Sequence, residues 1–164
     1  MIGATRQLVV GVADCRVTRD PDSTIVTYAL GSCIAVVIHD PMTRVGGMLH
    51  LMLPHSSLDP IKAERNPWMF ADTGIPLLLK NAYRAGAEKT RLLIRVAGGS
   101  QVVGEAGRFN IGKRNQLAVR DILRREGIGI HGESTGGNGS RTVRLDVGSG
   151  RLLLRNPDGS ETDL

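Results

Sequence analysis

The chain has 164 residues, of which 41% are hydrophobic and 23% charged, so it can bury the core of one domain without disulfide support. Aromatic residues make up only 3%, which argues against single-stranded nucleic-acid modules and carbohydrate sites, because both stack their ligands on aromatic rings. The net charge is +5, and the segment from Lys80 to Arg125 holds 11 basic and 3 acidic residues. This excess favours an acidic partner without specifying its class.

The N-terminal region bears on localisation. Its apolar run, 8–13, is far shorter than the ~18 to 20 residues of a membrane span, and Asp14 interrupts it. No other stretch approaches that length, so we expect a cytoplasmic protein that does not insert into membranes. In that compartment the two cysteines, Cys15 and Cys33, are expected to be free thiols.

The pattern along the chain predicts mainly β-structure. Short apolar runs are separated by Gly, Asp and Pro, and the clearest run is Arg141 to Val147, whose alternation predicts one buried and one solvent-facing side. The predicted strands cover residues 7–13, 24–30, 33–39, 45–53, 90–97, 128–133, 141–147 and 151–155.

Two segments carry apolar residues at helical spacing. The first follows Asp72, a residue type that favours a helix N-cap, and ends at Gly86. The second runs from about Lys113 to Glu126, with arginines along its outer side. The proline-containing segment 54–71 and the glycine-rich segment 134–140 are predicted to be loops.

Cys33 occupies a position suited to a nucleophile. It follows Leu30, Gly31 and Ser32, which predict a tight turn, and it precedes the apolar run 34–38. At such a strand edge, backbone N–H groups can stabilise both a thiolate and the oxyanion of an acyl-transfer reaction. The alternative is that Cys33 is a small buried apolar residue, which is the usual role of a single cysteine.

A hairpin between strands 33–39 and 45–53 predicts the partner of Cys33. A four-residue loop from Asp40 to Thr43 pairs His39 with Arg44, and the same register pairs Cys33 with His50. Directly opposed side chains share a face with Cβ atoms ~4.5 to 5.5 Å apart, close enough for a thiol and an imidazole to act together. A loop one residue longer or shorter would separate the two faces, and His50 would then be an ordinary strand histidine.

Other chemistry-bearing residues give weaker signals. Thr24 and Thr27, on the preceding strand, offer hydroxyls that can orient an imidazole, although most strand threonines have no such role. The cysteines and histidines lack the short paired spacing of metal sites, and the glycine-rich strings at 98–100 and 136–139 match no nucleotide-binding motif. We therefore expect neither a metal nor an organic cofactor.

These residues form part of a longer ordered pattern. Its strings are Thr27-Tyr28-Ala29-Leu30-Gly31-Ser32-Cys33, Gly46-Gly47-Met48-Leu49-His50-Leu51-Met52-Leu53-Pro54, Ala71-Asp72, Gly98-Gly99-Ser100, Ile111-Gly112-Lys113-Arg114-Asn115, Gly136-Gly137 and Arg141. Over roughly residues 7–155 the pattern resembles the CheD family of chemoreceptor glutamine deamidases. The turn ending in Cys33, followed by the string around His50, is its most specific part.

The resemblance implies a cysteine hydrolase that converts glutamine side chains of methyl-accepting chemotaxis receptors to glutamate, and in some members also hydrolyses methyl esters. Matched residue by residue, it places the nucleophile on Cys33, the general base and acid on His50, and the orienting threonine on Thr27. It also implies binding to a CheC-type phosphatase that acts on the response regulator CheY.

The fold that the resemblance implies is α+β, with stacked β-sheets in a sandwich-like core flanked by two or three α-helices. We expect one deamidase domain over residues 1–156 and a flexible tail at 157–164. Two alternatives stay open at this point. One is a non-catalytic adaptor that binds the phosphatase and needs no reactive Cys33; the other is a basic module that binds nucleic acid.

Overall fold

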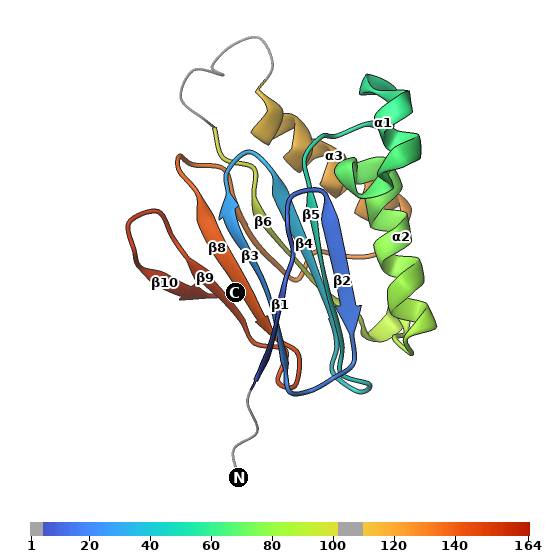
Figure 1. Ribbon diagram of the computed structural model, residues 1–164, viewed down its shortest axis with the longest axis vertical. Coiled ribbons are helices and arrows are strands. Elements are labelled where there is room, and N and C mark those ends of the chain that lie inside the picture. Colours follow the sequence, from blue (N-terminus) through green and yellow to red (C-terminus); the bar gives the residue numbers. More distant parts are fainter. Residues whose placement is uncertain (1–4, 102–109) are drawn as a thin grey trace.

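Two five-stranded β-sheets stack on one another, and the helices cover the outer side of one of them (Figure 1). The computed structural model describes residues 5–101 and 110–164. The first sheet has the order β1-β3-β8-β9-β10, and the second has the order β2-β5-β4-β6-β7. The predicted α+β class, with stacked sheets and flanking helices, is confirmed.

Along the chain, β1 and β3 enter the first sheet, β2 and β4 to β7 form the second, and β8 to β10 return to the first. The strands are β1 (Arg6–Val9), β2 (Asp14–Thr18), β3 (Ser23–Leu30), β4 (Ile34–Asp40), β5 (Val45–Leu51), β6 (Leu93–Gly98), β7 (Gly132–Thr135), β8 (Arg141–Asp146), β9 (Leu152–Arg155) and β10 (Glu161–Asp163). The α-helices are α1 (Pro60–Arg65), α2 (Ala71–Arg84) and α3 (Ile111–Arg125), with short 3₁₀ turns at Ser56–Leu58, Pro67–Met69 and Lys89–Arg91. None of the helices within the described ranges is long and apolar enough to cross a membrane.

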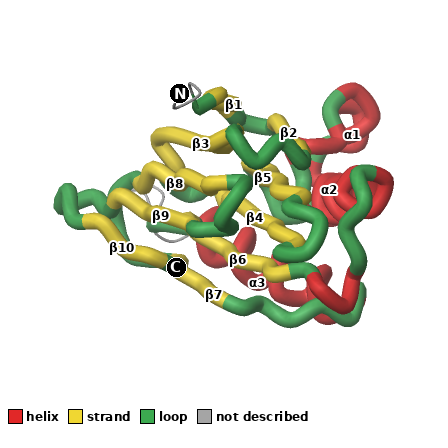
Figure 2. The backbone as a smooth tube through the Cα atoms, turned by 90° about the horizontal axis from the view of Figure 1, so that it is seen from below, coloured by secondary structure: helices red, strands yellow, loops and turns green. Residues whose placement is uncertain are grey.

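Two apolar layers hold the sheets and helices together. One layer lies between the sheets and includes Val37 and Met48, while the other lies between the second sheet and the helices and includes Val36 and Leu49. Consecutive residues of β4 and β5 enter different layers because side chains alternate along a strand. Figure 2 shows α2 and α3 against the sheet that contains β4, β5 and β6. The central strands β4 and β5 are therefore buried on both faces.

The structure corrects several element predictions. The helix predicted to follow Asp72 begins at Ala71 with Phe70 as its N-cap, so Asp72 lies in its first turn. The strand predicted at 7–13 is interrupted, because Ala13 adopts a positive φ of 55° and a second strand, β2, begins at Asp14. The strand predicted at 128–133 starts only at Gly132. The loop predicted at 54–71 contains α1, in which the Asp59 side chain accepts a hydrogen bond from a backbone N–H of the first turn and Pro60 stands at the first helical position.

The C-terminal segment belongs to the first sheet. β10 pairs antiparallel with β9, the backbone N–H of Leu164 donates to the carbonyl of Leu152 at 3.0 Å, and the Arg95 guanidinium donates to the main-chain oxygen of Leu164 at 3.0 Å. The expected tail at 157–164 is therefore corrected: residues 161–164 complete a sheet edge. Their polar side chains gave no strand signal because an edge strand of this kind is exposed on both faces.

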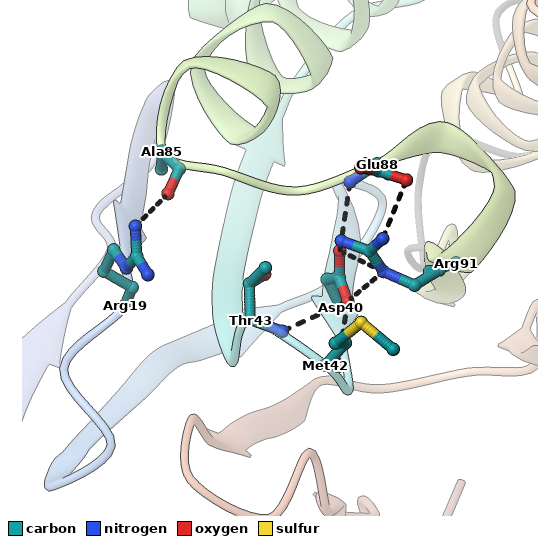
Figure 3. A network of polar contacts seen from close by, with 7 residues as sticks. All are labelled: Arg19, Asp40, Met42, Thr43, Ala85, Glu88 and Arg91. Carbon is teal, nitrogen blue, oxygen red and sulfur yellow. Dashed lines mark hydrogen bonds and ion pairs between the residues drawn. The ribbon is translucent and has the colours of Figure 1, made fainter.

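A buried carboxylate fixes the end of the β4–β5 hairpin (Figure 3). The side chain of Asp40 accepts hydrogen bonds from the backbone N–H of Met42 at 2.9 Å, from the backbone N–H of Glu88 at 3.0 Å and from Arg91 Nη2 at 2.9 Å. Burial alone would raise the pKa of Asp40, but these hydrogen bonds outweigh it and hold the pKa well below its usual range. The hairpin is thereby tied to the segment that connects α2 with β6.

We expect Asp40→Asn to lower the free energy of unfolding by about 3 kcal/mol, because it leaves Arg91 facing a half-buried site without its anion. Glu88→Gln is the matched control, since Glu88 is the exposed second partner of Arg91 and its loss should cost about 1 kcal/mol or less. Urea unfolding of the two variants at neutral pH measures both values. Equal losses would show that the Asp40 network does not hold the hairpin.

Candidate active site

The turn that carries Cys33 is held by the end of β6. The backbone N–H of Ser100 donates to the carbonyl of Gly31 at 2.9 Å, and that of Gly99 donates to the carbonyl of Cys33 at 2.8 Å. A Cβ atom at Gly98, which has a φ of +108°, would lie 2.3 Å from the same Cys33 carbonyl. Only glycine fits there, and the close approach fixes the turn against its neighbour.

A β-bulge precedes this turn. Thr27 pairs with Val143 and Leu30 with Arg141, so β3 holds one extra residue between the two pairs. Ala29 takes up the irregularity with a φ of 54°, a region that costs a non-glycine residue energy. Because of the extra residue, Thr27 and Leu30 are both buried, although regular alternation would put them on opposite faces.

The register of the β4–β5 hairpin differs from the predicted one by two residues. Asp40 pairs with Val45, so His50 lies opposite Ala35 and not opposite Cys33. The predicted loop began at Asp40, but the buried carboxylate of Asp40 keeps this residue in β4. A shift of two residues preserves the face, so Cys33, just before β4, becomes a diagonal neighbour of His50. In a regular ladder such neighbours lie about 7–8 Å apart.

The two cysteines face opposite layers. Cys33 is half-buried and packs against the apolar layer between the sheets, whereas Cys15 packs against the layer beneath the helices. Burial, with a smaller contribution from the neighbouring Asp14 carboxylate, raises the pKa of the Cys15 thiol to about 12. Cys15 is therefore an unreactive thiol near neutral pH.

The imidazole of His50 is oriented by a buried hydrogen-bond chain between the two sheets. Thr27 Oγ1 lies 2.7 Å from the carbonyl oxygen of Val10 and 2.7 Å from His50 Nδ1. A hydroxyl has one proton, and the carbonyl of Val10 can only accept, so Thr27 donates to Val10 and accepts from Nδ1–H of His50. This places the ring proton on Nδ1 and leaves the lone pair on Nε2.

The unprotonated nitrogen of His50 is poised to act as a base. His50 is buried, and its Nε2 has no hydrogen-bond partner among the described residues. Burial lowers the pKa of His50 to about 4, because the charged imidazolium loses its hydration. The ring is therefore neutral at physiological pH. A buried Nε2 with a free lone pair on the face shared with Cys33 is suited to accept a thiol proton.

The comparisons with known proteins agree with the sequence pattern. A family model described as CheD chemotactic sensory transduction matches residues 52–156. A probable chemoreceptor glutamine deamidase CheD of Solibacter usitatus is 51% identical over 96% of this chain and 93% of its own length. The chain belongs to the CheD family.

Two further CheD relatives have similar sequence identity and coverage. Probable chemoreceptor glutamine deamidase CheD 1 of Syntrophus aciditrophicus is 45% identical over 96% of this chain and 98% of its own length. CheD 2 of Anaeromyxobacter dehalogenans is 48% identical over 92% of this chain and 95% of its own length. This chain therefore spans nearly the whole of these CheD proteins.

The structure brings the three predicted site residues to the space between the two sheets. Thr27 and His50 are in direct contact, and Cys33 lies on the face of the second sheet that His50 shares. Thr24, the other candidate threonine, lies with Thr27 in the regular part of β3 that precedes the bulge. The two are an odd number of positions apart, so Thr24 points to the other face of the sheet. Within the described residues, no three His, Cys, Asp or Glu side chains cluster as a metal site.

Sequence reasoning assigned no role to Asn115, although it lies within the CheD pattern. Its Nδ2 donates to the carbonyl of Ser32 at 3.0 Å and to that of Met52 at 2.9 Å. The only signal was an asparagine on the inner side of a predicted amphipathic helix, where an apolar residue is expected. Its partners are backbone carbonyls from distant segments, which no sequence pattern specifies.

The buried neutral His50 predicts a pH-dependent stability. Between pH 6.5 and about 4 the unfolded chain binds a proton at His50 and the folded chain does not, so the free energy of unfolding falls as the pH falls. The difference between the His50 pKa of 6.5 in the unfolded chain and about 4 in the folded chain corresponds to about 3 kcal/mol in the free energy of unfolding. Urea unfolding at pH 7.5 and pH 4 should show this loss in the wild type and not in His50→Gln.

The exposed His55 provides the control for this experiment. His55→Gln should keep the wild-type dependence of stability on pH, because its ring is in solvent in both states. If His50→Gln kept the wild-type pH dependence as well, the buried neutral state of His50 would be disproved.

Proposed function

We propose that this protein is a cysteine-dependent amidohydrolase that converts glutamine side chains of chemoreceptor cytoplasmic domains to glutamate. Its CheD relatives from Solibacter usitatus and Syntrophus aciditrophicus are named probable chemoreceptor glutamine deamidases, which supports the substrate class. The observation that carries the chemistry is the neutral His50, held by Thr27 with its Nε2 unprotonated on the face of Cys33. In this proposal Cys33 is the nucleophile, His50 the general base and acid, and Thr27 the orienting residue.

The reaction follows from these roles. His50 Nε2 accepts the proton of the Cys33 thiol, and the sulfur attacks the glutamine carboxamide carbon to form a C–S bond. The tetrahedral intermediate collapses with cleavage of the C–N bond, and the imidazolium returns its proton so that ammonia leaves. A water molecule, deprotonated by the same nitrogen, then cleaves the thioester. Glutamate is released and the thiol is restored.

Backbone N–H groups of the turn 31–33 supply the oxyanion site in this mechanism. The carbonyls of Gly31 and Ser32 are engaged by Ser100 and Asn115. In a trans peptide the N–H group points opposite to the carbonyl of the same unit. The N–H groups that follow these carbonyls therefore face away from Ser100 and Asn115, and they are the donors that we assign to the developing oxyanion.

Cys33→Ala should abolish deamidation, whereas Cys15→Ala should retain most of it, because the Cys15 thiol lies on the opposite face with its pKa raised to about 12. The assay is ammonia release, and a one-dalton gain, from a glutamine-bearing chemoreceptor cytoplasmic fragment. His50→Ala should lower kcat by about 10²- to 10⁴-fold. Substantial turnover by purified Cys33→Ala would exclude the thiol mechanism and favour the adaptor alternative.

We further propose that the basic segment 80–125 helps to recruit an acidic receptor surface. Three of its arginines already face carboxylates: Arg91 with Asp40, Arg120 with Glu133, and Arg125 with Asp121. The cations that stay exposed without such an ion pair include Lys113, Arg114 and Arg124 on α3, while Arg108 lies outside the described residues. Because Arg120 already pairs with Glu133, it is a weaker docking candidate than Arg114 and Arg124. Cytoplasmic location and a CheC-type partner stay predictions from the sequence.

Salt should separate docking from chemistry. At ~0.15 M ionic strength the screening length is about 8 Å and at 1 M about 3 Å, so electrostatic recruitment weakens over this range. Rising salt should lower kcat/KM for an intact receptor fragment far more than for a short neutral glutamine peptide. Arg114→Gln should reduce the salt dependence, and Arg120→Gln should change it less, because Glu133 already pairs with Arg120. Equal salt dependence for both substrates would assign the basic excess to solubility.

A further inference from the structure

Asn115 joins the two segments that carry the proposed catalytic pair. It lies in the second turn of α3 and is fully buried. Its Nδ2 donates to the carbonyl of Ser32, the residue before Cys33, and to the carbonyl of Met52, two residues after His50. One amide group therefore holds both the nucleophile turn and the end of the histidine strand.

The two carbonyls that Asn115 contacts lie just beyond the paired part of the β4–β5 hairpin. The β4–β5 ladder ends with the pair Ile34 and Leu51, so the next residues on each side have no rung of their own. Gly99 and Ser100 hold the Cys33 turn to the end of β6, and Met69 holds Met52, but Asn115 joins the two backbones to each other from outside the sheet. Cys33 stands beyond the last rung, so the ladder itself does not fix its distance from His50.

The amide makes this bridge at an energetic cost. Both partners are carbonyls, so both must accept from Nδ2, which uses both of its protons. The remaining atom, Oδ1, is buried and has no hydrogen-bond partner among the described residues. A buried unpaired acceptor typically costs about 1–3 kcal/mol. The two hydrogen bonds that Nδ2 donates to Ser32 and Met52 must offset this cost.

The helix that presents Asn115 is itself seated against the turn. A Cβ atom at Gly112 would lie 2.3 Å from the carbonyl oxygen of Ser100, so α3 approaches the end of β6 at a distance that only glycine allows. Gln116 Nε2 donates to the carbonyl of Gly99 at 2.9 Å. These contacts leave the Asn115 side chain little freedom to move away from Ser32 and Met52.

We propose that Asn115 is a positioning residue that sets the separation between Cys33 Sγ and His50 Nε2. This inference rests on the proposed roles of those two residues. Without the bridge, the turn and the end of β5 relax apart and the thiol proton is no longer within reach of the imidazole. Substrate contacts elsewhere are unaffected, so the loss falls on kcat and on the reactivity of Cys33.

The test compares two variants of Asn115. Asn115→Leu keeps the side-chain volume but removes both N–H donors. Asn115→Ser leaves room for water to reach the two carbonyls, so it preserves the fold if the leucine variant does not. In either folded variant kcat for ammonia release should fall about 10- to 100-fold, with KM within about threefold of wild type. Alkylation of Cys33 by iodoacetamide at neutral pH should slow in parallel, as followed by mass spectrometry.

Arg95→Met is the matched control. Arg95 is also buried and donates to two main-chain oxygens, those of Leu164 and Gly150, which lie outside the turn and the histidine strand. This control should lower the melting temperature and leave kcat and Cys33 alkylation near wild type.

The outcomes separate the inference from the proposed function. Folded Asn115 variants with wild-type kcat and alkylation rate, or losses matched by Arg95→Met, would overturn the positioning role. If Cys33→Ala and His50→Ala are inactive while both Asn115 variants are active, only this inference fails. If Cys33→Ala stays active, the proposed chemistry fails first.

Discussion

The site depends on one buried hydrogen bond between the two sheets. Thr27 lies on the first sheet and His50 on the second, and their contact fixes where the imidazole stands and which nitrogen carries its proton. The direction of this bond follows from Val10, whose carbonyl takes the only proton of the Thr27 hydroxyl. In an apolar layer such a chain has no water to replace it, so it constrains both sheets at once.

Several features of the fold serve this contact. The bulge at Ala29 keeps Thr27 and Leu30 on the inner side of the same strand, although they are separated by an odd number of positions. Backbone strain of this kind persists only where surrounding packing determines it, and such strain is common next to functional sites. Here it lets the strand deliver an orienting hydroxyl and then turn at once into the segment of Cys33.

The hairpin register shows how a local error can leave a functional inference intact. The sequence placed Asp40 in the loop because an Asp-Pro pair is typical of a turn, whereas its buried ion pair with Arg91 keeps it in β4. The resulting shift is two residues, and the period of a strand is also two. The side chains of Cys33 and His50 therefore stay on one face, although they are diagonal rather than opposed.

The sequence by itself predicted the two long helices and most central strands, because these depend on local periodicity. The stacked α+β class and the proposed roles of Cys33, His50 and Thr27 came from the resemblance of its motifs to the CheD family. It could not predict β10, whose exposed polar residues are ordered only by pairing with β9. It also could not predict the partners of Asn115, because hydrogen bonds to backbone carbonyls leave no pattern in the residues that accept them. Tertiary packing alone decided the protonated nitrogen of His50 and its lowered pKa, since both follow from burial between two sheets.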